Sequence, residues 1–414
     1  MTGERVSKFM MPTLQLIIPA LIAALVLSLP FLSRPRGDER GLAQRNLAFA
    51  QEQFLLALQR LQPSDLNPRT LNADGTLQLV PSRDWTSGFF PGSLWLLYEY
   101  TGMESWRASA QKFTRNVEQE KSNGTTHDMG FKMFCSFGNG YRLTNDAEYK
   151  EILLQSARML ITRFNPLVGC IRSWDHHQHL WQFPVIIDNM MNLELLFWAA
   201  KVSGEAAFYD IALRHAETTM KNHFRSDYGT WHVLNYDSAT GAVLNRHTHQ
   251  GYAHESTWAR GQAWALYGFT MVYRETRDRR FLEQAQHIAD YILNHKNLPE
   301  DMVPYWDYDV PNIENEPRDA SAAAVMCSAL FELGTHLRPG GARYKSAAEK
   351  TLTSLSSQKY LAKLGENGNF LLQHAVGNKP ANSEIDVPIV YADYYFLEAN
   401  LRKLRLEESV DGIR

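Results

Sequence analysis

The residues best suited to chemistry lie in one segment and at two isolated positions upstream of it. The segment His249–Trp264, HQGYAHESTWARGQAW, combines aromatic rings, side-chain amides and an arginine. Asp128 stands in HDMGF and Asp188 in FPVIIDNMMN. Rings, an arginine fork and two spaced carboxylates together supply what is needed to hold an acidic sugar and to deliver a proton to it.

Both aspartates also have an ordinary structural role open to them. Asp188 closes the apolar run FPVII and opens a helical stretch, and Asp128 follows TTH at another helix start, so each could be an N-cap. A helix N-terminus favours the charged carboxylate, whereas a general acid must stay protonated near neutral pH. Burial would raise the pKa of Asp188, and a nearby Asp128 is expected to raise it more.

The downstream segment strengthens the catalytic interpretation. Arg260 offers a planar fork that matches a carboxylate, and Trp258 offers a flat ring that suits a sugar face. Gln250 precedes them in the loop, and Trp264 follows one helical turn later. The structural alternative is that Arg260 pairs with Glu255 and that the tryptophans belong to the core. The histidines of SWDHHQHLW have spacings that suit no helical metal site, so no metal is expected.

Helical periodicity accounts for most of the chain and predicts its fold. Twelve segments carry the pattern: Asn46–Leu61, Gly88–Tyr100, Glu104–Val117, Gly130–Leu143, Ala147–Arg163, Asn189–Ala200, Glu205–Asn222, Ala259–Arg274, Phe281–Asn294, Ala320–Leu333, Tyr344–Leu355 and Val387–Leu401. Short turns such as YEYTGMESW and YRLTNDAEY join them in pairs, as between antiparallel helices. Six such hairpins close into a double ring, so the sequence predicts an all-α (α/α)6 barrel.

Four long connections separate the hairpins and hold many of the remaining aromatic, histidine and aspartate residues. They are Asn165–Ile187, Phe224–Thr257, Lys296–Arg318 and Leu361–Asp386. If the short turns occupy one end of the barrel, these loops crowd the other end. Binding sites are usually built from loops on a rigid scaffold, so the pocket is expected there.

Composition and the N-terminus restrict partners and location. A net charge of −3 provides no basic field for nucleic acid. Cys135, Cys170 and Cys327 lack metal-ligand spacing and are read as buried thiols. Phe9–Ser33 is uncharged and apolar, so residues 1–37 are expected to be a signal peptide or an N-terminal membrane anchor. Residues 38–414 would then be the catalytic domain, in the periplasm or anchored facing the periplasm or exterior.

Six motifs, taken together, resemble the unsaturated glucuronyl hydrolases of glycoside hydrolase family 88, an (α/α)6-barrel family. These motifs are RDWTSGFFPGSLW, HDMGF, IIDNMMN, GTWH, HQGY and STWARGQAWALYGF, in family order from about residue 45 to 405. The resemblance implies removal of a 4,5-unsaturated uronic acid from the non-reducing end of oligosaccharides left by polysaccharide lyases. The implied reaction hydrates the vinyl ether rather than attacking the anomeric carbon, and it uses no metal or organic cofactor.

The same resemblance assigns roles to individual residues. Asp188 would protonate C4 of the sugar and then, as carboxylate, help activate the water that adds at C5, with Asp128 as its partner carboxylate. The positions matching the sugar site and the surroundings of the water and the uronate are Trp85, His127, Trp174, His232, Gln250, Trp258, Arg260 and, from the aromatic segment, Trp264. The loop GNKPANSEIDVP would border the aglycone, where Asn378 or Lys379 could meet a sulfate or a hydroxyl.

Other readings of the sequence stay open. A rhamnogalacturonyl hydrolase would use the same barrel and the same hydration chemistry, although HDMGF and STWARGQAW resemble the glucuronyl family better. A non-catalytic surface protein that binds sugars would keep the tryptophans and the arginine but would not need Asp188. A sugar epimerase would want paired histidine bases, for which the sequence offers no equally clear candidates. The polysaccharide that supplies the substrate is left undecided.

Overall fold

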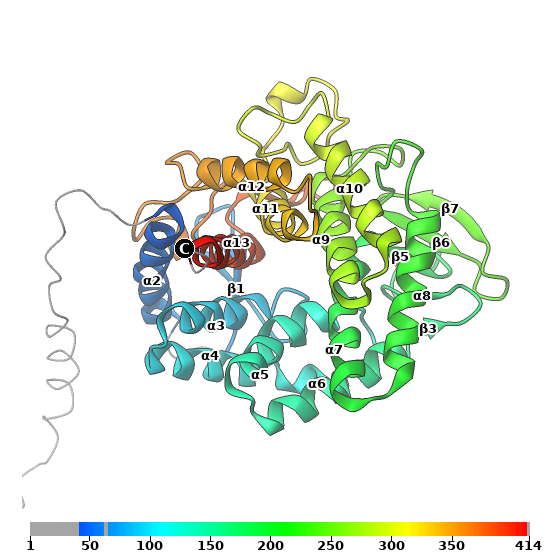
Figure 1. Cartoon of the computed structure of the whole chain (residues 1–414), viewed down its shortest axis with the longest axis horizontal. Coiled ribbons are helices and arrows are strands. Elements are labelled where there is room, and N and C mark those ends of the chain that lie inside the picture. Colours follow the sequence, from blue (N-terminus) through cyan, green and yellow to red (C-terminus); the bar gives the residue numbers. More distant parts are fainter. Residues whose placement is uncertain (1–40, 62–64, 412–414) are drawn as a thin grey trace, which may run out of the picture. The chain divides into compact units, whose positions relative to one another are not determined.

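The computed structural model describes residues 41–61 and 65–411, and these form two concentric rings of α-helices (Figure 1). The inner ring contains α3 (Phe89–Thr101), α5 (Asn139–Thr144), α7 (Leu193–Ser203), α9 (Ala259–Thr276), α11 (Ala320–His336) and α13 (Val390–Asp411). The outer ring contains α2 (Leu42–Arg60), α4 (Glu104–Val117), α6 (Ala147–Ile161), α8 (Ala206–Asn222), α10 (Arg279–Asn294) and α12 (Ala342–Leu355). Helices alternate between the rings along the chain. The predicted (α/α)6 barrel is confirmed.

The distribution of apolar residues explains which helices are inside. In α9 every residue from Ala259 to Val272 is buried. Its outer partner α10 buries only one stripe, which includes Phe281, Ile288 and Ile292. A helix that is buried all round must pack on every side, whereas an amphipathic helix covers a core with one face.

Short turns join an inner helix to the next outer one, as expected from their composition. Gly102, Asn145 and Gly204 end α3, α5 and α7 in the left-handed backbone conformation, which glycine and asparagine adopt at low cost. The sixth pair is made by the two ends of the barrel sequence, because α2 packs against α13. Asn46 Nδ2 donates to Asn400 Oδ1 across this contact at 2.8 Å.

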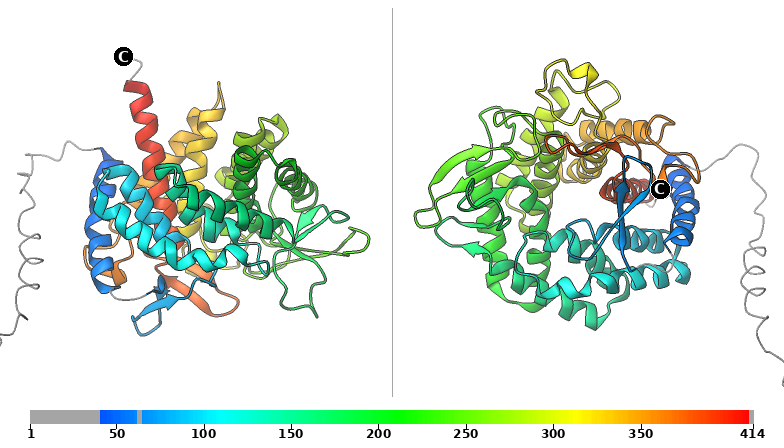
Figure 2. Two further views of the ribbon diagram at one scale, coloured as in Figure 1. Left: turned by 90° about the horizontal axis from the view of Figure 1, so that it is seen from below. Right: turned by 180° about the vertical axis from the view of Figure 1, so that it is seen from behind.

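The long connections gather at the opposite end of the barrel from these turns (Figure 2, left). Three of these connections, and the segment between α2 and α3, carry short antiparallel strands that the helical prediction missed. These are β1 (Asn67–Leu71) and β2 (Leu77–Val80) between α2 and α3, and β3 (Phe164–Asn165), β4 (Cys170–Ile171), β5 (Pro184–Ile186), β6 (Val233–Tyr236), β7 (Val243–His247), β8 (Ala375–Asn378) and β9 (Ser383–Val387) in or at the edges of the long connections. Strands of two to five residues are too short for alternation of apolar and polar residues to reveal them.

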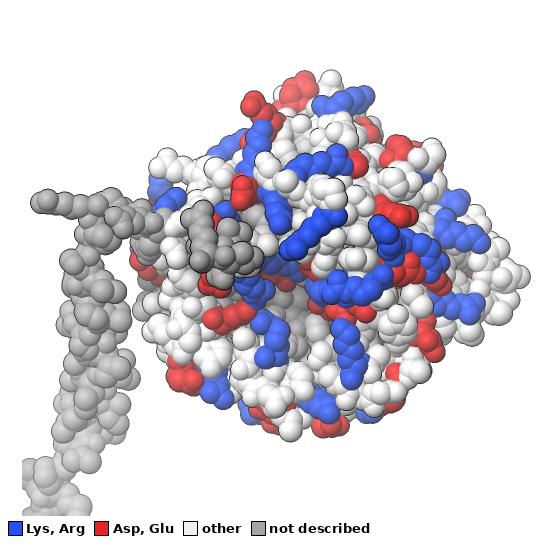
Figure 3. All heavy atoms as spheres, viewed as in Figure 1, with Lys and Arg blue, Asp and Glu red and all other residues white. Residues whose placement is uncertain are grey.

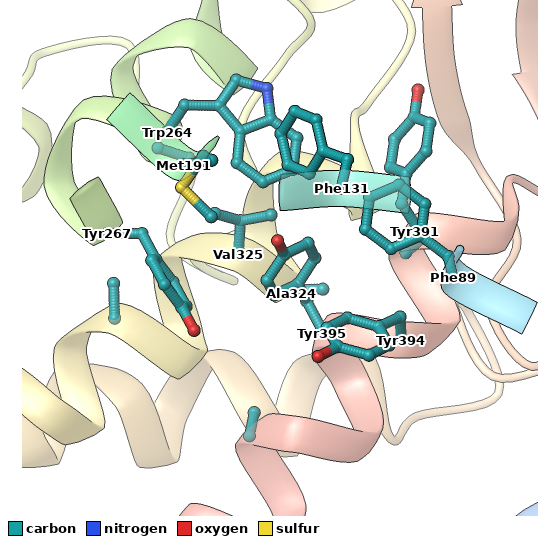
Figure 4. Close-up of a cluster of buried hydrophobic side chains, with 14 of the residues drawn as sticks. Phe89, Phe131, Met191, Trp264, Tyr267, Ala324, Val325, Tyr391, Tyr394 and Tyr395 are labelled. Carbon is teal, nitrogen blue, oxygen red and sulfur yellow. The ribbon is translucent and has the colours of Figure 1, made fainter. Parts of the chain in front are cut away.

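A layer of buried aromatic side chains fills the middle of the barrel (Figure 4). The Trp264 ring centroid lies 5.2 Å from that of Phe131 and 5.3 Å from that of Tyr395, and Phe89 is 5.4 Å from Phe131. Phe131 lines both the cavity at the long-loop end and a second cavity, of about 590 Å³, at the short-turn end. The aromatic layer therefore separates two cavities on the barrel axis.

A belt of ion pairs surrounds the cavity at the short-turn end. Arg274 of α9 contacts Glu194 of α7 and lies 2.9 Å from Glu332 of α11, and Arg402 of α13 lies 2.8 Å from the same Glu332. Arg142 of α5 completes the belt by pairing with Glu99 of α3 at 2.5 Å. Lysine and arginine side chains accordingly gather around the centre of this face, with carboxylates between them (Figure 3).

The expected leader, residues 1–37, lies outside the described residues. Among the residues that are described, no helix is both long enough and apolar enough to cross a membrane.

Candidate active site

A cavity of about 380 Å³ opens at the long-loop end of the barrel, where the loops were expected to build a pocket. Most of the residues selected from the sequence face it. It is lined by Trp85, Thr125, Thr126, His127, Asp128, Phe131, Ser173, Trp174, Asp175, His176, Ile186, Asp188, His249, Gln250 and Arg260.

Asp188 reaches the cavity because of a strand pairing. It is the second residue of the 3-10 helix η3 (Ile187–Asn192), directly after β5. Ile186 of β5 pairs with Val233 of β6, and the amide of Ile187 donates to the carbonyl of His232 at 3.1 Å. Asp188 therefore lies beside His232. Its side chain does not act as an N-cap, since η3 has no side-chain cap bond at its start.

The environment of Asp188 suits a general acid. Its side chain is buried, and burial is the main cause that raises its pKa from 3.8 to about 7. Arg260 and the backbone amide of Asp188 itself oppose this rise, while Asp128 adds the smallest contribution to it. The sequence argument expected the second carboxylate to contribute more than burial, and the structure reverses that order.

His232 faces Asp188 in a defined tautomer. Its Nδ1 accepts hydrogen bonds from the backbone amides of His249 and Gln250, both at 3.2 Å, so the proton of the neutral ring is on Nε2. Nε2 lies 3.6 Å from Oδ2 of Asp188, too far for a hydrogen bond, and both atoms are buried without a partner. Burial lowers the pKa of His232 well below 6.5, so the ring is a neutral donor.

Asp128 and His127 form a second polar group in the cavity. Asp128 precedes the π-helical segment η2 (Gly130–Gly138), and its Oδ2 accepts a 2.5 Å hydrogen bond from Thr126 Oγ1. Nε2 of His127 is 3.2 Å from Oδ1 of Asp128. Burial lowers the pKa of His127, although Asp128 opposes this, which favours the neutral imidazole as donor to the carboxylate.

Arg260 lines the cavity, but most of the N–H donors of its guanidinium bond to groups inside the protein. It is 1% exposed, and its Nη1 lies 3.1 Å from Oδ2 of Asp319 and also contacts the carbonyl of Val376. Nη2 donates to the carbonyl of Gly377 at 2.6 Å, whereas Nε has no partner. The internal partner is thus Asp319 and not Glu255, which accepts from Trp231 instead.

The four selected tryptophans fall into two groups. Trp85 and Trp174 line the cavity, and the Nε1 of Trp174 is buried without a hydrogen-bond partner. Trp258 lies behind the cavity wall, where its ring is 4.5 Å from that of His232 and 4.6 Å from the guanidinium of Arg260. Trp264 does not line the cavity, because it is fully buried in the aromatic layer (Figure 4).

Gln250 ties the C-terminal loop to the site. Its Nε2 donates to the carbonyl of Gly377 in β8 at 3.0 Å. Lys379, expected near the aglycone, pairs with Glu316, and its ammonium lies 5.2 Å from the centre of the Trp306 ring. Lys379 is not among the residues that line the cavity.

Sequence reasoning missed three residues at the site. His176 and His249 line the cavity, and Asp319 holds Arg260. His176 lies in a run of histidines that was weighed only as a metal site, whereas His249 opens the segment selected for its rings and amides but received no role of its own. Within the described residues no cluster of histidine, cysteine or acidic side chains could hold a metal ion. Asp319 stands in a D-x-S pattern at the start of α11. It is the N-cap of that helix, and its Oδ1 accepts a hydrogen bond from the backbone amide of Ser321 at 3.0 Å.

Known proteins match the chain both in sequence and in fold. Residues 64–402 match the model of Glycosyl Hydrolase Family 88. An unsaturated glucuronyl hydrolase of Formosa agariphila is 52% identical over 82% of this chain and 85% of its own. A crystal structure of an unsaturated glucuronyl hydrolase specific for heparin superposes with a TM-score of 0.86 at 50% identity, over 89% of this chain and 98% of that chain.

A third relative was solved with a sugar bound. It is a variant of an unsaturated glucuronyl hydrolase from Streptococcus agalactiae complexed with dGlcA-GalNAc6S, with a TM-score of 0.75 and 29% identity over 87% of this chain and 91% of that chain. Barrel and site together define a glycosidase with a helical double-ring scaffold. The chain belongs to Glycosyl Hydrolase Family 88, as its motifs predicted.

Proposed function

We propose that the chain removes a 4,5-unsaturated uronic acid from the non-reducing end of oligosaccharides by hydrating the vinyl ether, with Asp188 as the acid. The observation that carries the mechanism is the carboxyl group of Asp188, a residue that lines the cavity: its pKa is raised by burial, and its Oδ2 has no hydrogen-bond partner. Such a group can hold a proton at neutral pH and deliver it. The 52% identity to an unsaturated glucuronyl hydrolase supports the substrate class.

The proposed steps assign one role to Asp188 and one to His232. The protonated carboxyl group of Asp188 donates to C4, and the double bond leaves positive charge at C5 and the ring oxygen. The resulting carboxylate takes a proton from the water that adds at C5. His232 Nε2–H, which lies 3.6 Å from that carboxylate and is too far to donate to it directly, supplies a hydrogen bond to the water. The hemiketal then opens and releases the aglycone.

Isotope labelling tests the reaction, because it shows which product receives the oxygen of water and which carbon receives the proton. Turnover in ¹⁸O-water should label the released uronate product and leave the new hydroxyl of the aglycone unlabelled, and D₂O should place deuterium at C4. Loss of the ultraviolet absorbance of the conjugated enol-acid gives the rate. Equal cleavage of saturated glucuronides without deuterium at C4 would contradict hydration and would return Asp128 and Asp188 to an inverting acid and base pair.

Substrate source and location are also proposals. Lyase fragments of heparin type are the first to test, because a solved relative at 50% identity is described as specific for heparin. A rhamnogalacturonyl disaccharide serves as the comparison substrate and should react more slowly. Residues 1–37 are proposed to direct residues 38–414 out of the cytoplasm; their uncharged apolar stretch supports this. Fractionation of cells that express the full chain tests it, and cytoplasmic recovery would overturn it.

A further inference from the structure

Among the described residues, none that lines the cavity supplies a free permanent positive charge, although the proposed substrate is an anion. Arg260 is the one arginine or lysine among the residues that line it, and that guanidinium is paired with Asp319 at 3.1 Å. Asp175 is likewise paired, with Arg163 at 2.9 Å and Arg172 at 3.4 Å. This leaves Asp128, and Asp188 whenever it has lost its proton, facing the incoming uronate, and a carboxylate there repels an anion unless another cation forms.

Histidine rings occupy the wall where such a cation could form. His176 and His249 line the cavity, and their ring centroids are 6.5 Å apart. His177 bridges them, with its ring 4.6 Å from His176 and 6.1 Å from His249. The ring of His176 stacks on Trp174 at 5.0 Å with an interplanar angle of 8°. The two loops that meet here, around residues 174–181 and 247–254, therefore present imidazole rings to the cavity from one side.

We propose that His176 and His249 form the anion-binding wall of the pocket, and that the anionic substrate binds together with a proton taken up from solution by this pair. The proposal rests on the hydration activity assigned above. The ring that gains the proton becomes an imidazolium and pairs with the carboxylate of the uronate or with a sulfate on the fragment, which share the chemistry of a small oxyanion.

The groups that face the histidines favour neutral rings in the empty pocket. Burial and then His177 lower the pKa of His176, while Asp175 opposes this. Burial, His176 and His177 lower the pKa of His249. An anion placed between the rings reverses the sign of the local field, so it favours protonation.

Groups on the neighbouring elements complete the surroundings of this pair. On the β7 side, Trp181 Nε1 donates to His247 Nδ1 at 3.0 Å, and His247 stacks on His254 at 4.4 Å. On the barrel side lie the neutral ring of His232, the paired Arg260, and the carboxyl groups of Asp128 and Asp188. His127 shares that side and contacts Asp128, with His179 further out, 5.9 Å from His177.

Calorimetry can measure the number of protons taken up on binding, provided that Asp188 is first replaced by a residue that does not titrate. Asp188 titrates near neutrality and would itself take up a proton beside an anion, so binding is measured in Asp188→Asn, which also prevents turnover. The unsulfated unsaturated uronyl-hexosamine disaccharide is titrated at pH 6.5 in two buffers of different ionisation enthalpy. We expect uptake of about half to one proton per disaccharide, and affinity that falls by up to about tenfold per pH unit between about pH 6.5 and 8.

Matched variants locate the proton. In the Asp188→Asn background, His176→Gln with His249→Gln should abolish most of the uptake and raise the Kd about tenfold at pH 6.5. His179→Gln, an exposed histidine of the same loop that does not line the cavity, should change neither. Unchanged uptake in the double variant would overturn the proposal, as would its absence in Asp188→Asn alone. Each single variant is measured as well, in case the double variant folds poorly.

Two further ligands identify the anion and separate this inference from the proposed function. If the carboxylate of the uronate is the partner of the imidazolium, the methyl ester of the uronate should bind without proton uptake. If a sulfate is the partner, binding of a sulfated disaccharide should be accompanied by uptake of more protons than binding of the unsulfated one. If wild type consumes the disaccharide but the Asp188→Asn variant binds it with no uptake, only the histidine wall fails. If wild type neither binds nor consumes it, the proposed function fails.

Discussion

Asp188 must hold a proton before the reaction and bear a negative charge after donating it, and burial affects these two states in opposite ways. Burial raises its pKa to about 7, which keeps the acid protonated, but burial also makes the charged form costly once the proton has left. Asp188→Asn should therefore lower kcat by about 10²- to 10⁴-fold, since an amide cannot deliver the proton. In wild type, kcat should fall as pH rises through about 7, and steady-state rates over pH 5 to 9 measure both effects. Near wild-type turnover in the variant would remove Asp188 from the mechanism.

The same raised pKa predicts a stability effect of opposite sign. The folded state holds a proton on Asp188 up to about pH 7, whereas the unfolded chain loses it near 3.8, so the free energy of unfolding falls as pH rises across that window. Asp188→Asn should thus be more stable than wild type above pH 7, by on the order of a few kcal/mol, and equal to it below about pH 4. Thermal melts across pH test this, with Asp227→Asn, whose carboxylate is 60% exposed, as the neutral control.

Arg260 connects the site to the C-terminal loop, so its replacement should affect both binding and folding. Arg260→Lys keeps the charge but cannot satisfy Asp319 and the carbonyls of Val376 and Gly377 together. We expect a higher KM for unsaturated uronides and a loss of about 1–3 kcal/mol in stability. Arg246→Lys, at an exposed arginine over Trp231, is the matched control and should change neither. Unchanged melting and kinetics would show that these contacts are dispensable.

Part of the site was predictable from residue types and part was not. Asp128, Asp188, Trp174 and Gln250 were selected from their motifs, and all four line one cavity. Trp264 was selected by the same argument but packs in the aromatic layer, because a helix turns its successive residues to different sides. Asp319 is 59 residues from Arg260 along the chain, and no local pattern predicts a pairing over that separation.

At the scale of elements, the 3-10 helix η3 is held tightly by its neighbours. A Cβ on Gly268 of α9 would lie 2.5 Å from Cβ of Met190 in η3, and a Cβ on Gly130 would lie 2.6 Å from Cα of Asn192. These glycines allow the backbones to approach closely and so fix the helix that carries Asp188. Real Cβ atoms do not approach this closely, so an alanine at either position would force η3 to move.

The sign of the stability change in Gly268→Ala tests whether η3 is held in place by α9. In an exposed helix this change stabilises by about 0.5–1 kcal/mol. Here the clash with Met190 should instead destabilise by about 1–3 kcal/mol and reduce kcat by displacing η3. Denaturant unfolding and steady-state kinetics provide the two readouts. Stabilisation without loss of activity would show that η3 can shift freely.

The helices were predicted well and the strands were not, for a physical reason. Eleven of the twelve α-helices described extend over about three turns or more, so their apolar period repeats and can be read from the sequence. Strands β5 and β6 are three and four residues long, and their pairing joins segments about 50 residues apart. That pairing brings Asp188 beside His232, so the arrangement proposed to be catalytic depends on strands that periodicity cannot reveal.

At the scale of the whole barrel, the ion-pair belt links inner helices to one another at the short-turn end. Glu332 lies between Arg274 and Arg402, and these two guanidinium groups hold its pKa well below the usual range against burial. Its contribution to stability is therefore present above about pH 4.5 and lost as pH falls further.

Glu332→Gln tests the belt directly. It should cost about 3–5 kcal/mol at pH 7, because two guanidinium groups lose their shared carboxylate, and the difference from wild type should shrink in acid. Glu349→Gln removes a carboxylate that is 57% exposed in a surface pair with Lys403, and it should be close to neutral. Chemical unfolding at pH 7 and pH 3 separates these outcomes. Equal, small losses for both variants would show that the belt does not stabilise the barrel.

The aromatic layer of Phe131, Trp264 and Tyr395 also determines how a sugar chain can enter and leave the barrel. Because it closes the floor of the catalytic cavity, the barrel is not a tunnel, and a polysaccharide cannot thread through it. Only the tip of a chain can enter, which makes the enzyme exo-acting by shape alone. A uronate bound beside Asp188 would lie at the inner end of this cavity and would have to leave by the entrance, after the remainder of the chain has withdrawn. Each turnover is therefore expected to end in complete dissociation rather than in processive trimming of a bound chain.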